Sequence, residues 1–409
     1  MRSLAPLAAL CLLSACNLLG GDDDDDTPPI EDPALAPEPV APVDPPANDS
    51  TGDDTRQGGG STLRIPGLEG LEIPLPNPNP NRPDPEPPAR GTLAAAPPGS
   101  YDAGGHLTRA FMESRAETVH QALVAALDAH ERSQVTDVPF EVVITDEPNA
   151  AAGCTRGDRR PVMMITSSML NLVAGISETS AYDELASTET YEAYVTHVVG
   201  EVRGGRPVPD VEASAHSAPH ATDAHKLARQ VHLFDQQVAF ILGHELAHHY
   251  RGHTNCVQGR SDSEVQRDEL MGMLSRTVPP FEQPREVEAD MWGLVDVLEA
   301  GHERPGGEWT EEGALLNMDF FRRLSDRGGQ EILLAFFSTH PPSAVRIPIV
   351  RSTAQQWTPG YRPPRMPTAD GNNTGGLPIP ENLPIPEGLP IPRGLPIPGF
   401  GGGGGNSGN

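Results

Sequence analysis

The stretch LFDQQVAFILGHELAH, residues 233–248, decides the fold. Its large apolar residues recur at helical spacing, which predicts one long helix packed inside the protein. Three polar residues, His244, Glu245 and His248, stand within this apolar helix. Burying three such groups on one face is costly unless they share a partner such as a metal ion. The stretch therefore predicts a buried helix that carries a polar site.

His244, Glu245 and His248 form the pattern HExxH. Residues four apart lie on one face of a helix, so both imidazoles can reach the same ion, with Glu245 beside the water of that ion. Zn²⁺ suits neutral imidazoles, and a catalytic zinc keeps one position for a water whose pKa falls to about 7. The pattern predicts a single Zn²⁺ per chain, with Glu245 as the base. The alternative is an ordinary helix in which a five-residue pattern has arisen by chance.

A third metal ligand has two candidates, His253 and Glu286. The pattern HExxHxxGxxH would require a glycine at position 251, but this position is Arg, and the final histidine is one residue early. We therefore interpret His253 as a polar residue low on the same helix, near its end, with a metal role as the alternative. Glu286 remains the other candidate ligand.

Outward from this helix, residues 101–359 form the predicted body, because apolar residues recur there and Pro and Gly become less frequent. Alternating and β-branched residues predict strands over 140–144 and 161–166. Two strands beside several helices indicate an α+β fold, mainly helical with a small β-sheet. The segment 176–225 has weak periodicity and is predicted to be a lid or a surface loop. The apolar stripe of the first helix is predicted to comprise Ala110, Val119, Leu123, Ala126 and Leu127.

Both flanks of the body have a composition that does not support a packed core. Residues 17–100 combine an acidic run with repeated Pro and Gly, which predicts a disordered tether. In residues 360–409 the unit LPIP recurs every six residues before a run of glycines, which predicts an extended low-complexity tail. We interpret both arms as spacers, and a partner-binding role of the tail is the alternative.

Residues 1–16 have the pattern of an export signal. Arg2 precedes an apolar run that ends in Leu13-Ser14-Ala15-Cys16, and this run is too short to cross a membrane. The ending resembles the lipobox of bacterial lipoproteins, which implies cleavage before Cys16 and lipidation of its thiol. The expected location is the bacterial cell envelope, on the periplasmic side or outer surface, with the membrane contacted through the lipid anchor. An ordinary cleaved signal is the alternative.

Cys154 and Cys256 are the two thiols expected to remain in the body of the mature protein. An oxidising envelope favours a disulfide between them. Two buried small side chains, or thiolate ligands to a metal, are the alternatives.

Composition excludes one class of partner. The chain of 409 residues has 29 basic and 57 acidic residues, without a cluster of Lys and Arg. Binding to nucleic acid requires such clusters to neutralise phosphates, so we expect no nucleic-acid partner.

Three blocks in the second half of the chain resemble the gluzincin peptidases related to the CaaX prenyl proteases and the HtpX-like proteases. The blocks are GHELAHHYRGH at 243–253, EVEADMWG at 286–293 and STHPPSAVRI at 338–347, and they occur in the order of that family. The resemblance covers about 233–351 and implies a zincin-like metallopeptidase domain. Many relatives have several membrane spans and this chain has none, which indicates the soluble periplasmic or lipoprotein branch and argues against prenylated substrates.

The resemblance also implies roles for single residues. Glu286 completes the zinc site, and Asp290 orients a zinc-binding histidine. His340 and Arg346 lie near the active cleft and engage the substrate or the oxyanion that forms during hydrolysis. From the residues alone, the alternative is a rigid turn at His340 and a surface charge at Arg346.

These observations predict a zinc-dependent endopeptidase that hydrolyses protein or peptide substrates of the envelope, with a role in quality control. A non-catalytic metal-binding lipoprotein, acting as an assembly scaffold or chaperone, is the first alternative. The second is an adhesin whose active part is the LPIP repeat.

Overall fold

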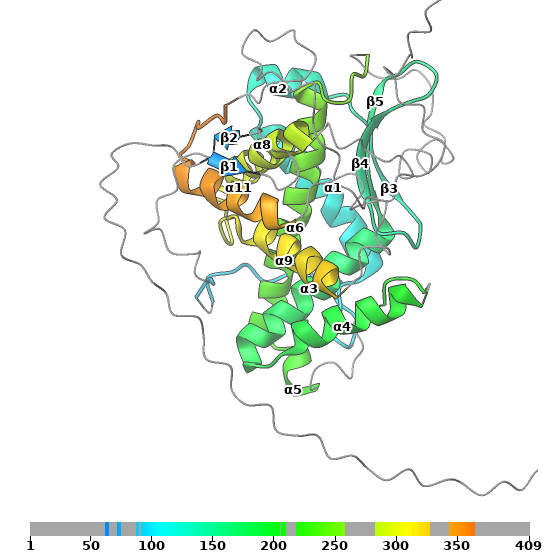
Figure 1. The fold of residues 1–409 in the computed structure, drawn as a ribbon. Coiled ribbons are helices and arrows are strands. Elements are labelled where there is room, and N and C mark those ends of the chain that lie inside the picture. The colour runs from blue at the N-terminus through cyan, green and yellow to red at the C-terminus, as the bar shows by residue number, and fades with distance from the viewer. Residues whose placement is uncertain are drawn as a thin grey trace, which may run out of the picture. The chain divides into compact units, whose positions relative to one another are not determined.

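A computed structural model of the chain describes residues 62–64, 72–74, 87–89, 91–204, 206–209, 218–257, 283–327 and 343–364. Within these ranges the fold is α+β and mainly helical, as the sequence predicts (Figure 1). None of the helices in the described ranges is long and apolar enough to cross a lipid bilayer. The helices are α1 (Arg109–Ala126), α2 (Ala129–Val135), α3 (Ser167–Ala186), α4 (Thr190–Arg203), α5 (Ala218–Ala221), α6 (Ala224–Tyr250), α8 (Gln283–Gly301), α9 (Glu312–Asp326) and α11 (Ser343–Gln356).

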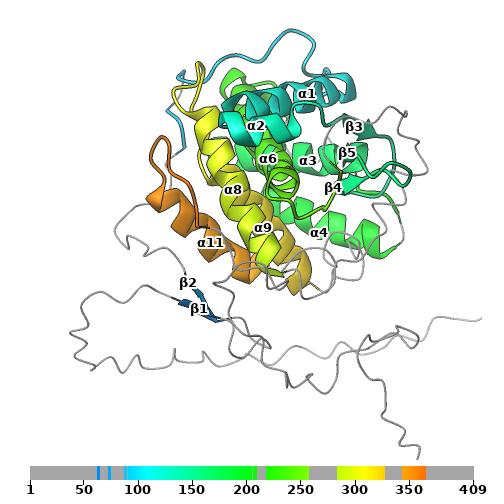
Figure 2. The same ribbon diagram turned by 90° about the horizontal axis from the view of Figure 1, so that it is seen from above.

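Helix α6 is the central element of the body. It begins at the N-cap Asp223, whose carboxylate accepts hydrogen bonds from the amides of His225 and Lys226. Every residue from 228 to 247 is buried, because α1, α3, α8 and α9 all pack against this helix. In Figure 2, α8, α9 and α11 lie on one side of α6, while α3 and α4 lie on the other. The polar pattern of α6 is thus held at the centre of the core.

The sheet has three strands, one more than the sequence predicts. They are β3 (Phe140–Val143), β4 (Ala150–Cys154) and β5 (Pro161–Thr166), in the order β3-β5-β4. Strand β5 is parallel to β3 and antiparallel to β4, and all six residues of this central strand are buried. The sequence of β4 is AAAGC, and its small side chains give no alternating apolar pattern.

Helices α6 and α8 approach one another at two glycines. A β-carbon on Gly293 would lie 2.5 Å from the amide nitrogen of His244, and one on Gly243 would lie 2.8 Å from the carbonyl oxygen of Gly293. Because neither residue has a side chain, the two backbones come into contact. This contact places the start of α8 beside the HExxH turn of α6.

The predicted lid or loop over 176–225 is wrong for most of its length. Residues 176–186 continue α3, and α4 follows after a short turn. The polar residues in this part of α3 are buried because they are paired: the hydroxyl of Ser177 donates to the carbonyl of Val173, and Glu178 contacts the ammonium of Lys226. Polar groups that have hydrogen-bond partners can be buried, and a buried helix that contains them lacks a regular pattern of apolar residues.

The first helix is present over Arg109–Ala126, but its predicted stripe needs a correction. Val119, Leu123 and Leu127 are buried, whereas Ala110 is exposed, because the buried face of the first turns is formed by Met112 and Ala116.

The flanking arms lie mostly outside the described residues. Within the predicted tether, strands β1 (Thr62–Arg64) and β2 (Glu72–Pro74) pair antiparallel. The amide of Ala94 donates to the carbonyl of Gly306, so packed structure precedes residue 101. The lipobox with Cys16 and the LPIP repeats fall outside the described ranges.

Candidate metal centre

His244, His248 and Glu286 come together where α6 meets α8. Nε2 of His244 lies 3.1 Å from Nε2 of His248. The carboxylate of Glu286 approaches both imidazoles, with Oε2 at 3.3 Å from His244 and Oε1 at 3.4 Å from His248. His244 and Glu286 are buried, and the side chain of His248 is 13% exposed. Within the described part of the chain, the two helices thus bury His244 and Glu286 and leave His248 partly exposed.

This donor set fits a zinc ion. Ligand atoms at 2.0–2.1 Å from a tetrahedral zinc lie about 3.3 Å from one another, which is close to the separations of these three side chains. Two imidazoles and one carboxylate are also a common ligand set of catalytic zinc, which keeps its fourth position for water. Among the described residues, these three form the group of His, Cys, Asp and Glu side chains that can hold a metal ion.

Asp290 lies one turn after Glu286 on α8 and is fully buried. Its Oδ1 lies 2.9 Å from Nδ1 of His244, so that the other ring nitrogen of His244 faces the centre of the site. Burial by itself lowers the pKa of His244, but its hydrogen bonds to the carboxylates of Asp290 and Glu286, together with their charges, outweigh burial and raise this pKa to about 9. A metal at this site therefore competes with a proton for His244.

Arg346 on α11 binds both carboxylate oxygens of Asp290. Its Nε donates to Oδ2 at 2.8 Å and its Nη2 to Oδ1 at 2.5 Å, and the residue is 6% exposed. Burial raises the pKa of Asp290, but the charge and hydrogen bonds of Arg346 outweigh it and lower the pKa to about 2. Arg346 is thus placed behind a histidine of the site, with both of these guanidinium nitrogens engaged by Asp290.

Glu245 points from α6 toward the sheet. Its Oε2 accepts a hydrogen bond of 2.6 Å from the backbone amide of Ala152 in β4, and the residue is 5% exposed. Because β4 pairs with β5 through its other edge, this amide belongs to the free edge of the sheet. This contact could not be predicted from the sequence, because the residues of strand β4 have no clear apolar pattern.

His253 lies beyond the end of α6, which corrects the prediction that it lies on this helix. Gly252 has a φ of 75° and reverses the chain, so that the amide of His253 donates to the carbonyl of His248 and the amide of Gly252 to that of His249. This pair of bonds is a Schellman ending, in which glycine takes the left-handed position. The sequence signal for it was Gly252 itself. His253 is buried beside His248.

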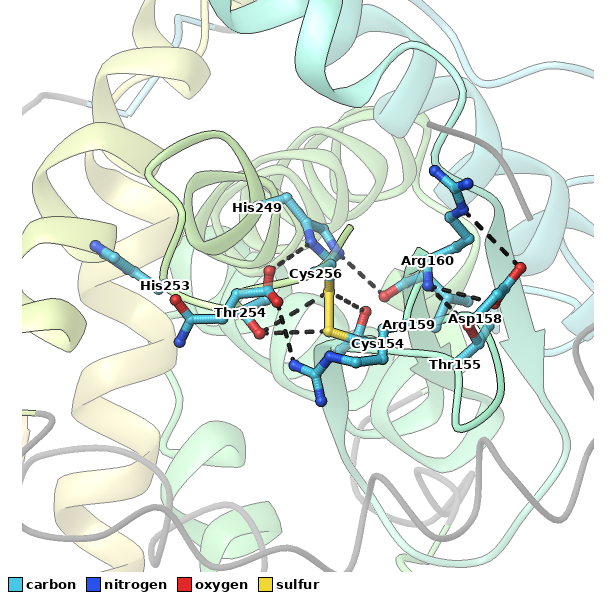
Figure 3. Close-up of a disulfide and its surroundings, with 12 residues drawn as sticks. Cys154, Thr155, Asp158, Arg159, Arg160, His249, His253, Thr254 and Cys256 are labelled. Carbon is cyan, nitrogen blue, oxygen red and sulfur yellow. Dashed lines mark hydrogen bonds and ion pairs between the residues drawn. A yellow bond between two sulfur atoms is a disulfide. The ribbon is translucent and has the colours of Figure 1, made fainter. Parts of the chain in front are cut away.

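A disulfide joins Cys154 at the end of β4 to Cys256 in the segment after α6, with a Cα separation of 5.4 Å (Figure 3). The amide of Val257 donates to the carbonyl of Arg159, so the same segment is also bonded to the β4–β5 connection. His249 lies nearby and its Nε2 is 3.0 Å from the carbonyl of Val162 in β5. The sheet and the segment that follows α6 are thus fastened together close to the metal centre.

Of the residues that the sequence assigned to the site, the structure brings together His244, Glu245, His248, Glu286, Asp290 and Arg346. His340 lies outside the described residues.

A buried HExxH helix, with a glutamate of a second helix completing a zinc ligand set, defines a zinc metallopeptidase. The chain matches peptidase family M48 over residues 113–354, more than half of its length, and it belongs to this family. It is therefore a zinc-dependent hydrolase acting on peptide bonds. No curated protein matches the chain, and no solved structure matches it.

Proposed function

We propose that this chain is an endopeptidase of the bacterial cell envelope in which His244, His248 and Glu286 hold the zinc ion. The observation that carries the proposal is the close approach of these three side chains, with 3.1 Å between the two Nε2 atoms and 3.3 and 3.4 Å from these atoms to the two oxygens of Glu286. The chemistry that zinc supplies at such a site is the activation of a water molecule and the polarisation of a peptide carbonyl.

Glu245 is the proposed general base and acid. It takes the proton of the attacking water on a carboxylate oxygen and delivers it to the nitrogen of the leaving amine. The hydrogen bond from the amide of Ala152 holds the carboxylate of Glu245 in place. Asp290 accepts from Nδ1 of His244 and keeps Nε2 of this ring turned toward the metal.

Arg346 acts through Asp290 in this proposal. Its bidentate contact with a buried carboxylate accounts for its position without any contact to a substrate. This differs from the substrate or oxyanion role that the resemblance implies. His340 keeps that role as a prediction.

The envelope location rests on the lipobox at Cys16 and on the Pro-rich residues 17–100 that follow it. In the proposal the thiol of Cys16 carries the lipid, and the body hydrolyses proteins of the envelope as part of quality control. Incorporation of a labelled fatty acid into the wild-type chain, and its loss in Cys16→Ser, is the expected result in a bacterial host. A wild-type chain that takes up no label contradicts the anchor.

The catalytic roles are tested with the full chain, its Glu245→Gln variant and its Glu286→Ala variant. We expect the wild type to retain zinc and to cleave unfolded casein. Glu245→Gln keeps the zinc and loses about 10²–10⁴-fold in kcat, because only the proton transfer is removed. Glu286→Ala loses zinc, since one of three ligands is gone.

Two outcomes contradict the proposal in different ways. A wild-type chain that holds zinc without cleaving supports the scaffold or chaperone alternative. A wild-type chain that holds no zinc contradicts the metal centre itself.

A further inference from the structure

His253 is buried between a zinc-binding histidine and an acidic residue. Its Nδ1 lies 3.1 Å from Nδ1 of His248, and its Nε2 lies 3.4 Å from Oε2 of Glu288. Both His253 and Glu288 are less than 10% exposed. This contact lies on the side of His248 that faces away from His244 and Glu286.

Zinc binding by His248 determines which atoms donate and which accept in the hydrogen bonds from His248 through His253 to Glu288. His248 turns its Nε2 toward the other ligands, so Nε2 has the free lone pair and the proton of the neutral ring is on Nδ1. Nδ1 of His253 is the acceptor within reach of that proton. His253 accepts there only if its own proton is on Nε2, and this nitrogen faces the carboxylate of Glu288. Each N–H of His248 and His253 in these contacts therefore faces an acceptor.

Three interactions hold His253 and the residues around it. The Schellman ending of α6 binds its amide to the carbonyl of His248. Arg251 donates from Nε at 2.8 Å to Oε1 of Glu288, the oxygen that does not contact His253. The disulfide holds Cys256, three residues later, at the end of β4 (Figure 3). A side chain fixed in this way has little freedom to turn away from His248.

We propose that His253 is a positioning residue for the zinc centre. It accepts the N–H of His248 and, backed by Glu288, fixes the tautomer and the plane of this ligand, as Asp290 does for His244. The inference deepens the proposed function and rests on it only in that His248 binds zinc. It replaces the interpretation of His253 as a polar residue near the end of the helix, and the alternative that it is a metal ligand.

The test compares His253→Phe with His253→Asn in the full chain. Phenylalanine keeps the ring volume without an acceptor, whereas the amide oxygen of asparagine can accept the N–H near the place of Nδ1. We measure the zinc dissociation constant by competition with a chelator, the visible absorption of the Co²⁺-substituted protein, and thermal unfolding of the metal-free protein. His232→Phe is the matched control, because His232 is also a buried histidine, located twelve residues before His244 on the same helix.

The expected result is that His253→Phe binds zinc about 10–100-fold more weakly and has an altered Co²⁺ spectrum. His253→Asn retains most of the affinity, and His232→Phe retains the wild-type affinity and spectrum. The proposal is overturned if His253→Phe binds zinc as the wild type does. It is also overturned if Phe and Asn weaken zinc binding equally, in step with a lower unfolding temperature of the metal-free protein, since the role is then one of packing.

Peptide cleavage is not among these measurements. An absence of cleavage by the wild type therefore counts against the proposed function and leaves the result on His253 intact.

Discussion

Asp290 is a fully buried carboxylate held between His244 and Arg346. A buried charge of this kind is tolerated because its partner and its hydrogen bonds replace the lost hydration. Removing Arg346 alone leaves the charge of Asp290 without compensation, which destabilises the fold more than removing both charges. Arg346 thus compensates the buried charge of Asp290, and Asp290 in turn orients the metal ligand His244.

The first prediction concerns this pair. Arg346→Met lowers the free energy of unfolding by about 3–5 kcal/mol, because Asp290 stays buried and loses its counter-charge. Urea unfolding measures the loss. The double variant Asp290→Asn/Arg346→Met is the control and recovers part of it, since no uncompensated charge remains. Equal stability of Arg346→Met and the wild type would show that the ion pair has no structural role.

The roles of single residues were predictable where the sequence pattern is local. HExxH placed two histidines on one face of one helix, and the acidic residues at 286 and 290 are likewise one turn apart. The contacts of Ala152 with Glu245, and of Glu288 with His253, join segments separated by 93 and 35 residues. The spacing of residues along the chain contains no information about such contacts.

At the level of elements, the contact of α6 with α8 depends on Gly243 and Gly293. We predict that Gly293→Ala forces the two helices apart, because the added methyl group would lie 2.5 Å from the amide nitrogen of His244. Zinc binding and thermal stability should both fall. In an open helical position the same substitution stabilises by about 0.5–1 kcal/mol.

Gly200→Ala is the matched control for this prediction, because Gly200 is exposed on α4 and a β-carbon there meets no atom within 4 Å. It should keep zinc binding and leave stability unchanged or improved. If Gly293→Ala behaves like Gly200→Ala, the helices are not held by a backbone contact.

Helix α1 supplies a pH-dependent contribution to stability through His120. Its ring stacks on Phe140 at a centroid distance of 4.9 Å, and burial lowers its pKa to about 4. The unfolded chain binds this proton below a pKa of about 6.5, but the folded chain binds it only below about 4. Stability is therefore lost as the pH falls from 6.5 toward 4, by roughly 1.4 kcal/mol per unit within this window.

We predict that His120→Phe reduces the loss of unfolding free energy between pH 7 and pH 5 by about 1–2 kcal/mol. Urea unfolding at the two pH values gives this difference. His130→Phe, at an exposed position of α2, is the control and keeps the wild-type difference. An unchanged pH dependence in His120→Phe would indicate that its proton binding is the same in both states.

Elements with a regular apolar pattern were predictable, and α1, α6, β3 and β5 lie where that pattern placed them. Strand β4 was missed because Ala and Gly at four of its five positions give no apolar signal. The second half of α3 was missed because Ser177, Glu178 and Thr179 are polar although they are buried. Polar residues in sequence are typical of a surface loop.

For the molecule as a whole, the disulfide between Cys154 and Cys256 spans 102 residues, a segment that contains the HExxH helix. A closed loop of this length restricts the unfolded chain strongly. We predict that the double variant Cys154→Ala/Cys256→Ala has a free energy of unfolding lower by about 2–4 kcal/mol under oxidising conditions. In excess reductant the wild type and the variant should become equally stable. A variant as stable as the oxidised wild type would contradict this role.

Helix α6 has 27 residues and is therefore about 40 Å long, and it is buried without interruption from residue 228 to residue 247. Backbone amides enclosed in this way exchange their hydrogens with solvent only when most of the surrounding structure opens. His244 lies inside this enclosed stretch and His248 directly follows it, so the backbone around both histidines is expected to open slowly. Metal ions are therefore expected to reach the site from the side of His248, whose side chain is 13% exposed, while the helix itself remains closed.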